Sequence, residues 1–270
     1  MFSKYFSWLQ FEIPERRTGI ILFCIIFLGL TLRVVHWYLE PSISRDGSYY
    51  LFIARQWYEC GSLNEIISAT AVNGAHFYIS PLLLALLRSA TICHLDPEKT
   101  ICILNIGLST ALVVLGYALC RVLNMVKEAA LVAALLLATH PGLIDLSHTV
   151  QRETLFLFFA TLMIFLLLQS EIRQNRPLLS WGCAGACWML AFFSRHEALE
   201  LVFMILFIVG WYAITRRSLR RSLLKKGLVF VASGALMLIA LNWWCQIPVE
   251  YYQSALSFRL HQAGIVETKP

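Results

Sequence analysis

The stretch TGIILFCIIFLGLTLRVVHWYL, residues 18–39, decides the fold class of this chain. A helix needs about 20 mostly apolar residues to cross the hydrocarbon core of a bilayer, and this stretch has that length and composition. Arg16 and Arg17 precede it, Arg33 and His36 lie near its far end, and no small-residue cleavage site follows. We therefore expect an uncleaved signal anchor that holds the chain in the membrane.

The composition of the whole chain agrees with this expectation. Of the 270 residues, 59% are hydrophobic and 14% are charged, and the mean hydropathy is +0.68. Such a composition places most residues in lipid rather than around a water-soluble core. The net charge of +6 comes from short basic clusters between apolar runs, which is the pattern that orients membrane proteins. The sequence indicates a polytopic membrane protein with no nucleic-acid partner.

Further apolar runs predict an all-α polytopic fold of about seven transmembrane helices. The run Pro81–Leu95 is not counted among the predicted spans. Its roughly 15 residues make a helix of about 22 Å, which is shorter than a hydrocarbon core of about 30 Å. Arg88 also interrupts it, so we expect this run to lie on the membrane surface. The predicted later spans are Thr100–Leu123, Ala129–Pro141, Glu153–Gln169, Pro177–Phe193, Ala198–Ile214 and Gly227–Ile247.

Basic residues in three connectors orient the chain. If the run Pro81–Leu95 does not cross, the connectors Arg121–Lys127, Glu171–Arg176 and Arg216–Lys226 face the same side as the N-terminus. The last connector alone contains six basic residues. By the positive-inside rule these connectors are cytoplasmic, which predicts a cytoplasmic N-terminus and an external C-terminus. A bacterial inner membrane is the location that we expect.

This topology divides the chain into a transmembrane core, residues 1–247, and a short non-cytoplasmic tail, residues 248–270. Within the core, residues 40–99 form a long first outer loop with interfacial helices. The ionisable residues that do not set the topology gather on the outer face. Because the bilayer penalises such groups unless they pair or meet water, they are candidates for a functional site.

Asp46 begins a part of the outer loop, DGSYYLFIARQW, that has the period of an amphipathic helix. Two roles are open for this acid. It can cap the helix N-terminus, for which Asp followed by Gly-Ser is well suited, or it can take part in catalysis together with its neighbour Arg45. The aromatic face that we expect in the headgroup region consists of Tyr49, Phe52, Ile53 and Trp57.

A second acid, Glu153, opens a predicted span and follows Arg152 directly. One explanation is that the positive end of the helix dipole favours a carboxylate in the first turn. The other is that Glu153 and Asp46, both at helix starts on the outer face, serve one reaction centre. Such a carboxylate pair can take the proton of an incoming hydroxyl group or hold a divalent cation.

Arg195 follows an apolar span in the sequence FFSRHE, residues 192–197. Its guanidinium group can bind a phosphate through two hydrogen bonds, or it can simply reach from the membrane boundary to water. His196 stands beside it. The histidines of the outer face are scattered and show no H-x-x-x-H spacing, so the sequence predicts no metal site.

These segments, in this order, resemble the GT-C membrane glycosyltransferases. Residues 46–56, DGSYYLFIARQ, are similar to the D-x-x-x-Y-x-x-x-A start of that family's first outer loop. Residues 76–83, HFYISPLL, resemble its proline-rich entry to an interfacial helix, and residues 139–156 resemble its second loop. Residues 191–198, AFFSRHEA, look like its L-T-R-x-E-(A/G) signature. The resemblance is to the branch of protein O-mannosyltransferases and aminoarabinose transferases, and it covers their N-terminal transmembrane core.

The resemblance implies transfer of a sugar from a polyprenyl-phosphate carrier to an acceptor at the outer membrane face, with membrane lipid around the site. Asp46 is then the base or the group that orients the acceptor, Glu153 is the second acid, and Arg195 meets the carrier phosphate. The other residues that we expect to bind the substrate are Arg45, Tyr50, Arg152 and His196.

Two other function classes remain open. Gly47 stands where many members of that family have a second acid, and the chain has fewer spans than full-length members. A catalytically inactive or truncated GT-C-like protein that acts as a lipid-binding accessory subunit is therefore one alternative. A transporter is another, although the sequence shows no convincing internal repeat and its candidate residues lie at the membrane boundary rather than at mid-span.

Overall fold

The computed structural model describes residues 15–40, 44–61, 80–173, 176–215 and 220–245. Part of the predicted outer loop, residues 41–43 and 62–79, and the predicted tail 248–270 lie outside the described residues. Within the described ranges all regular structure is helical, which confirms the predicted fold class. The helices are α1 (Glu15–Leu39), α2 (Arg45–Cys60), α4 (Pro81–Ile92), α5 (Pro97–Val122), α6 (Lys127–Thr139), α7 (Pro141–Ser147), α8 (Glu153–Arg173), α9 (Pro177–Ser194), α10 (Ala198–Thr215) and α11 (Arg220–Cys245).

Five of these described helices are long and apolar enough to cross a membrane: α1, α5, α8, α9 and α11. The pair α6 and α7 passes the same test together and is bent by 52° at the break between the two helices, so counting it as one span makes six. The apolar stretch Ala198–Tyr212 of α10 belongs to the shorter helices. The membrane fold is therefore confirmed, whereas the predicted number of seven spans is not.

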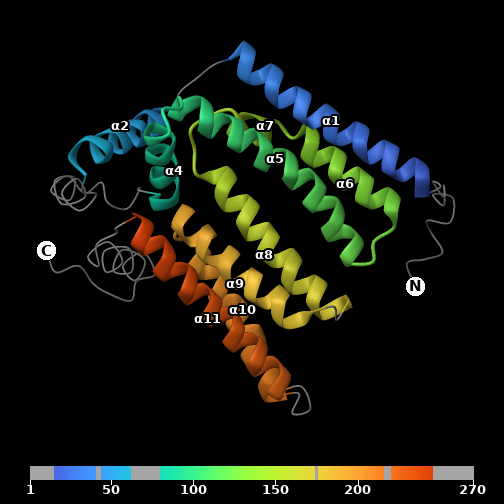
Figure 1. Ribbon diagram of the computed structural model, residues 1–270. Coiled ribbons are helices and arrows are strands. Elements are labelled where there is room, and N and C mark those ends of the chain that lie inside the picture. The colour runs from blue at the N-terminus through green and yellow to red at the C-terminus, as the bar shows by residue number, and fades with distance from the viewer. Residues whose placement is uncertain (1–14, 41–43, 62–79, 174–175, 216–219, 246–270) are drawn as a thin grey trace, which may run out of the picture.

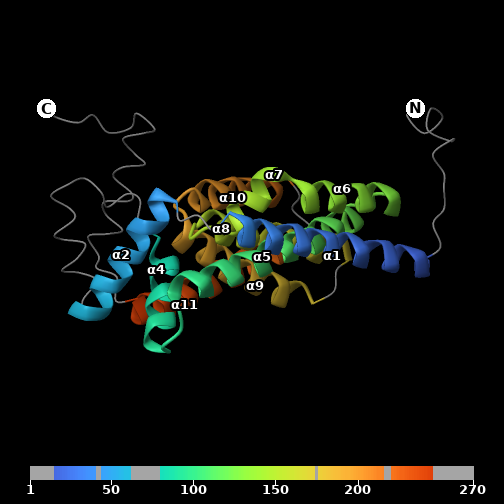
Figure 2. The same cartoon turned by 90° about the horizontal axis from the view of Figure 1, so that it is seen from above.

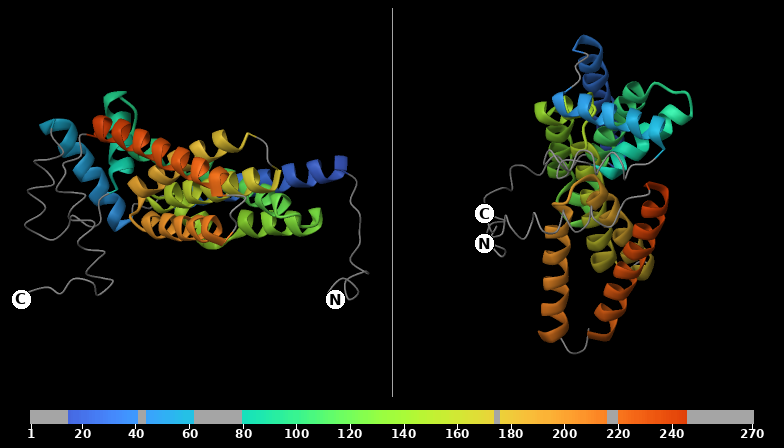
Figure 3. Two further views of the ribbon diagram at one scale, coloured as in Figure 1. Left: turned by 90° about the horizontal axis from the view of Figure 1, so that it is seen from below. Right: turned by 90° about the vertical axis from the view of Figure 1, so that its left-hand side faces the viewer.

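The long helices form two groups that meet along α5 and α8 (Figure 1). In the first group α1, α5 and α6 pack against one another. In the second, α9 packs against both α8 and α11, and α10 runs beside α11 (Figure 3). Large apolar side chains remain exposed on the outside of α10 and α11, among them Phe207, Trp211 and Trp243. A surface of this kind suits contact with lipid rather than with water.

The break between α6 and α7, which we call the broken-helix junction, is filled by Arg33 of α1. Because Pro141 has no N–H group, the carbonyl group of Leu137 loses its donor four residues on. Arg33, fully buried, donates to the carbonyl oxygens of Leu137 at 3.2 Å and Ala138 at 3.0 Å. It also donates to the hydroxyl group of Ser109 at 2.8 Å. The arginine that the sequence places near the far end of the first span thus satisfies backbone groups that the bend exposes.

One end of the bundle carries α2 and α4, which turn across the long helices (Figure 2). The packed face of α2 consists of Tyr50, Ile53, Ala54 and Trp57, all buried in one apolar cluster with α4. Phe52 is 57% exposed, so the predicted aromatic face that combined Phe52 with Ile53 and Trp57 is wrong. At 100° per residue, positions 50, 53, 54 and 57 form the helical stripe, whereas position 52 does not belong to it.

The run predicted to lie on the membrane surface forms α4, which is too short for the span test, as expected for a helix that does not cross. It is buried over most of its length, because it packs between α2, α5 and α9. One further prediction needs correction. The connector Arg216–Lys226 was expected to be a loop, yet α11 already begins at Arg220. Its basic residues from position 220 onward therefore extend from the first turns of a helix.

Candidate functional site

The first turn of α2 begins with a serine cap. The side chain of Ser44 accepts a hydrogen bond from the backbone N–H of Gly47 at 2.9 Å, so Ser44 and not Asp46 is the N-cap residue. The prediction that Asp46 caps the helix is therefore wrong. Asp46 lies exposed in the first turn, and no hydrogen bond or ion pair joins its carboxylate to another residue that the structure describes.

Gly47 allows α2 to lie directly on the loop that precedes α8. A Cβ atom at this position would stand 2.9 Å from the carbonyl oxygen of Val150 and 3.2 Å from its Cβ atom. A side chain would therefore push the helix start away from the loop. The glycine found where the resemblance expects a second acid has a steric reason, since it brings Asp46 close to the residues that follow Val150.

The loop itself is held by α5. The side-chain amide of Asn105, which is fully buried, donates to the carbonyl oxygens of Thr149 at 2.9 Å and Gln151 at 3.2 Å. One turn away, the thiol of Cys102 donates to the carbonyl oxygen of His148 at 3.1 Å. These contacts fix the backbone on both sides of Val150. The next two residues, Arg152 and Glu153, thereby start α8 from a defined position.

Arg195, directly after α9, links two carboxylates. Its Nε and Nη2 atoms donate to the two oxygens of Glu197 at 3.2 and 3.1 Å, and its Nη1 atom donates to Glu153 at 3.2 Å. Three of the five N–H groups of a guanidinium therefore have carboxylate partners among the described residues. Its hydrogen bond to Glu197 raises the pKa of Arg195, so the charge is permanent at any physiological pH.

Tyr50 connects α2 with these charges. Its side chain is buried, and burial is the main cause that raises the pKa of its hydroxyl group. Arg152 and Arg195 lower this pKa through their charges, while Glu153 and Asp46 raise it. Electrostatic coupling of this kind requires proximity. The structure thus brings together one tyrosine and charged groups from α2, the start of α8 and the end of α9.

We call this group the charged cluster and define it as Asp46, Tyr50, Arg152, Glu153, Arg195 and Glu197. Within it the Nε atom of Arg152 lies 3.7 Å from the carboxylate of Glu153. The remaining predicted site residues stand at its edge. Arg45 is exposed in the first turn of α2, and His196 is buried with its ring edge-on to Phe192, 5.5 Å between the ring centroids.

Comparisons with known proteins give the family of the chain. A family model described as dolichyl-phosphate-mannose-protein mannosyltransferase matches residues 79–244, more than half of the chain. The chain belongs to this family. Membership places it among the GT-C-like glycosyltransferases that act on a polyprenyl-phosphate-linked sugar. No match was found among curated proteins or among solved structures.

The mannosyltransferase-family match covers only part of the charged cluster. Arg152, Glu153, Arg195 and Glu197 lie inside the matched range, whereas Asp46 and Tyr50 precede it. The structure joins the two parts, because Gly47 seats α2 on the loop before α8.

The predicted carboxylate pair of this mannosyltransferase-family chain, Asp46 and Glu153, does not suit a divalent cation. Glu153 lies against two guanidinium groups, those of Arg152 and Arg195, and positive charges at this distance repel a cation. The same neighbours suit an anion, because they supply N–H donors and positive charge. The charged cluster is therefore better fitted to a phosphate than to a metal ion.

One member of the cluster was not among the residues predicted to form the site. Glu197 makes the two-pronged contact with Arg195, and its signal in the sequence is the acid of the R-x-E signature. The spacing alone does not show the contact, since residues 195 and 197 would point in different directions on a regular helix. Arg195 has an extended backbone as the C-cap of α9, which allows the two side chains to meet.

An apolar cavity of about 490 Å³ lies between α8, α9, α10 and the start of α11. Ile164, Leu168, Ile205 and Val209 are among its lining residues. Its first lining residue on α8 is Ile164, eleven residues after Glu153. At the rise of an α-helix this spacing corresponds to about 16 Å. At its far end Glu171 accepts hydrogen bonds from Trp181 and Lys226, as the donor distances of 3.0 and 2.7 Å show.

Proposed function

We propose that this protein transfers a sugar from a polyprenyl-phosphate carrier to a hydroxyl-bearing acceptor at the outer membrane face. The observation that carries the proposal is the charged cluster. The exposed carboxylate of Asp46, which has no hydrogen-bond or ion-pair partner among the described residues, lies in the same cluster as Arg195, an arginine that two acids hold in place. A base for the acceptor and a cation for the departing phosphate are what such a transfer needs.

In the proposed reaction the acceptor oxygen attacks the anomeric carbon of the sugar. Asp46 takes the proton of the acceptor hydroxyl group as the new C–O bond forms. The bond between the anomeric carbon and the phosphate oxygen breaks, and its electron pair leaves with the polyprenyl phosphate. Negative charge grows on this phosphate in the transition state, so a fixed cation beside it lowers the barrier.

Arg195 has the geometry to stabilise the negative charge on the departing phosphate. Its bonds to Glu197 and Glu153 leave one N–H on each terminal nitrogen, as far as the described residues are concerned. Two such donors match two oxygens of a phosphate. Arg152 adds a second positive charge on the other side of Glu153.

Glu153 acts in this proposal through Arg195 rather than as a proton acceptor. Its carboxylate is bound by one arginine at 3.2 Å and lies 3.7 Å from the other. One oxygen of this carboxylate already accepts a hydrogen bond from Arg195, so we assign Glu153 to holding that arginine. Its role as the second acid thus becomes the orientation of the phosphate-binding arginine.

The apolar cavity between α8, α9 and α10 supports a lipid-linked donor. A chain of isoprene units has no hydrogen-bonding groups, so it needs a lining such as that of Leu168, Ile205 and Ile208. Since the cavity begins about 16 Å from Glu153 along α8, a carrier with its phosphate at Arg195 can extend its chain in that direction.

We also propose how the chain is oriented in the membrane and to which branch of the glycosyltransferase family it belongs. A cytoplasmic N-terminus follows from the basic connectors and places the charged cluster outside, in a bacterial inner membrane. The branch of protein O-mannosyltransferases and aminoarabinose transferases is supported by the RHEA sequence at 195–198. The accessory-subunit alternative is not favoured by the family match.

The test compares Asp46→Asn and Glu153→Gln in isolated membranes supplied with radiolabelled polyprenyl-phosphate sugars. We expect Asp46→Asn to lower transfer by about 100-fold or more, because a general base is lost. Glu153→Gln should lower it by about 10-fold, because a neutral amide holds Arg195 less strongly. Asp96→Asn is the matched control: Asp96 caps α5, and Asn caps equally well.

Unchanged transfer by the Asp46→Asn variant would remove this residue from catalysis. A wild-type chain that binds polyprenyl phosphate but transfers no sugar from any donor of the panel would instead support the accessory-subunit alternative.

A further inference from the structure

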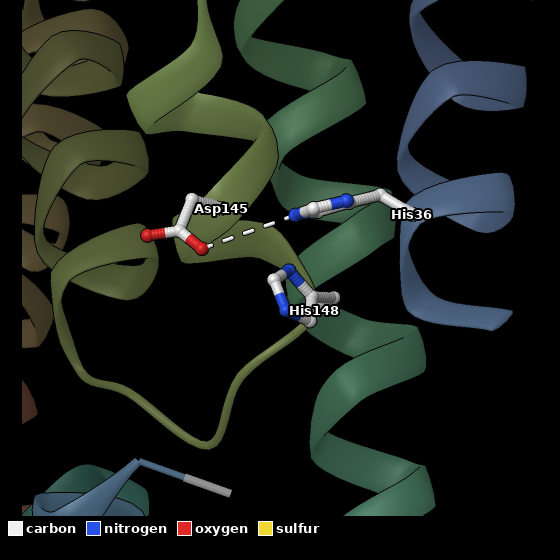
Figure 4. Close-up of side chains that lie close together, drawn as sticks. All are labelled: His36, Asp145 and His148. Carbon is white, nitrogen blue, oxygen red and sulfur yellow. Dashed lines mark ion pairs between the residues drawn. The ribbon is translucent and has the colours of Figure 1, made fainter. Parts of the chain in front are cut away.

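Two histidines and an aspartate from distant parts of the sequence meet at the end of α1. His36 extends from the last turns of α1, while Asp145 and His148 come from α7 and the residue that ends it (Figure 4). One ligand atom from each of the three side chains lies within 4.8 Å of the other two. None of the three belongs to the charged cluster, and the proposed sugar transfer uses none of them.

We propose that His36, Asp145 and His148 bind a divalent transition-metal ion, with Zn²⁺ as the best-fitting ion. The Nε2 atom of His36 lies 3.9 Å from an oxygen of Asp145. In a tetrahedral site with bonds of about 2.0–2.1 Å the donor atoms are about 3.4 Å apart. The three donor atoms therefore need only rotamer adjustments to surround one ion.

The types of the ligands select the class of metal. Imidazole nitrogen suits zinc and its first-row neighbours, whereas Mg²⁺ and Ca²⁺ prefer sites made of oxygen alone. Two histidines with one carboxylate are a known ligand set for zinc, and the fourth position is then open to water or another oxygen. Glu40 is within reach of this position, because its carboxylate lies 3.9 Å from Nε2 of His36.

The site is supported by the surrounding structure. His148 is almost fully buried, its Nδ1 atom lies 3.4 Å from the carbonyl oxygen of Ile144, and its own carbonyl group is held by Cys102. A contact of this kind between an imidazole and a carbonyl group orients the ring of a metal ligand. On the other side, Arg33 ties α1 to the broken-helix junction one turn before His36.

Without an ion the same contacts stabilise little. Asp145 is 73% exposed, and a surface ion pair at 3.9 Å contributes about 0–1 kcal/mol. The rings of His36 and His148 meet edge to face with their centroids 4.4 Å apart. An ion held by both rings and by Asp145 would add stronger bonds than these contacts.

A bound ion would connect α1 to α7 across the broken-helix junction. His148 precedes Arg152 by four residues, and the loop between them carries the contact with Gly47. The ion would thus stiffen the segment that leads to the charged cluster without contacting the substrate. This inference does not depend on the proposed sugar transfer.

The test measures metal binding by the full chain, purified in detergent with a tag free of histidine and stripped with a chelator. Equilibrium dialysis against Zn²⁺ should give one ion per chain, and Co²⁺ should give the visible absorption of a four- or five-coordinate site. His36→Gln and Asp145→Asn are the main variants, since both side chains are partly exposed. Each should weaken binding at least about 10-fold, the loss that even indirect metal contacts produce.

His94→Asn is the matched control. His94 is an exposed histidine outside the site with a positive φ of 57°, which asparagine tolerates. It should bind Zn²⁺ as the wild type does. Equal binding by wild type and both main variants would overturn the proposal, as would a wild-type chain without saturable binding. A rise of the unfolding temperature with Zn²⁺, lost in Asp145→Asn, gives a second measurement that does not depend on activity.

Discussion

The broken-helix junction and the charged cluster are both built around an arginine, but the partners of the two arginines differ. Arg33 is fully buried and donates to neutral groups, namely backbone carbonyls and the hydroxyl of Ser109. Arg195 is partly exposed, with 29% of its side chain accessible, and donates to two carboxylates. One arginine completes the backbone hydrogen bonding of a bent helix, and the other remains open to a ligand.

The difference shows how to distinguish a structural cation from a functional one in a membrane protein. Buried carbonyl groups in lipid must find donors, and the donors they bind are then unavailable for other chemistry. A cation that lies between acids at a membrane boundary keeps unused N–H groups and meets water. Sequence position does not separate the two cases, since both arginines stand at or near the C-terminal end of an apolar helix.

The largest effect on stability is expected at the broken-helix junction. Arg33→Met removes the side-chain donor of the carbonyl groups of Leu137 and Ala138, whereas the hydroxyl group of Ser109 keeps its bond to Leu143. At about 1 kcal/mol for each of the two carbonyl groups, the free energy of unfolding should fall by about 2 kcal/mol, measured by unfolding in mixed micelles. Arg55→Met is the control, because Arg55 is exposed and its ion-pair partner within the described part of the chain is Glu59 alone. If both variants lose the same stability, the structural role of Arg33 is wrong.

The charged cluster should respond in the opposite way. Arg195→Gln removes the group that donates hydrogen bonds to the carrier phosphate. It should lower sugar transfer by about 100-fold, which corresponds to a rise of about 2.7 kcal/mol in the activation barrier. The free energy of unfolding should change by less than about 1 kcal/mol, since ion pairs at a partly exposed site contribute little. Arg195→Lys should recover only part of the activity, because an ammonium group cannot make the two-pronged contact. An Arg195→Gln chain that unfolds as readily as Arg33→Met would erase the contrast between the two regions.

The smallest effect concerns the contact that joins α2 to the charged cluster. Gly47→Ala places a Cβ atom 2.9 Å from the carbonyl oxygen of Val150. Moving the two segments apart should cost about 1–2 kcal/mol of folding free energy and lower transfer, because Asp46 moves with the helix. Gly107→Ala is the control, since Gly107 lies within α5 with no atom close to a new Cβ. It should leave stability equal or higher, and a loss as large as that of Gly47→Ala would argue against the steric explanation.

Much of the fold was predictable because apolar length and helical period are local properties. The predicted span Pro177–Phe193 differs from α9, Pro177–Ser194, by one residue. The errors came where a tertiary contact overrides a local preference. Asp46 is a good capping residue, yet Ser44 takes the cap, and Phe52, predicted to share one face with Trp57, is exposed while Trp57 is buried.

The sequence singled out most residues of the charged cluster, but not Glu197 and not the contacts between them. Glu153 and Arg195 stood out because ionisable groups at membrane boundaries are costly. That Arg195 binds both Glu153 and Glu197 could not be derived, because the extended backbone at position 195 follows from packing at the end of α9. The histidines gave no metal signal, since His36 is more than 100 residues from His148 in the chain.

By itself the sequence determined that this chain is a helical membrane protein, and it predicts that the basic connectors share one side while the candidate acids and arginines stand at the other. These properties follow from the free energy of transferring each segment to lipid, which depends on local composition. Only the tertiary structure decided which arginine is occupied by carbonyl groups and which is held between acids. It also decided that His36, Asp145 and His148 meet. Contacts of this kind join residues far apart in the chain, and helix packing, not local composition, sets their distances.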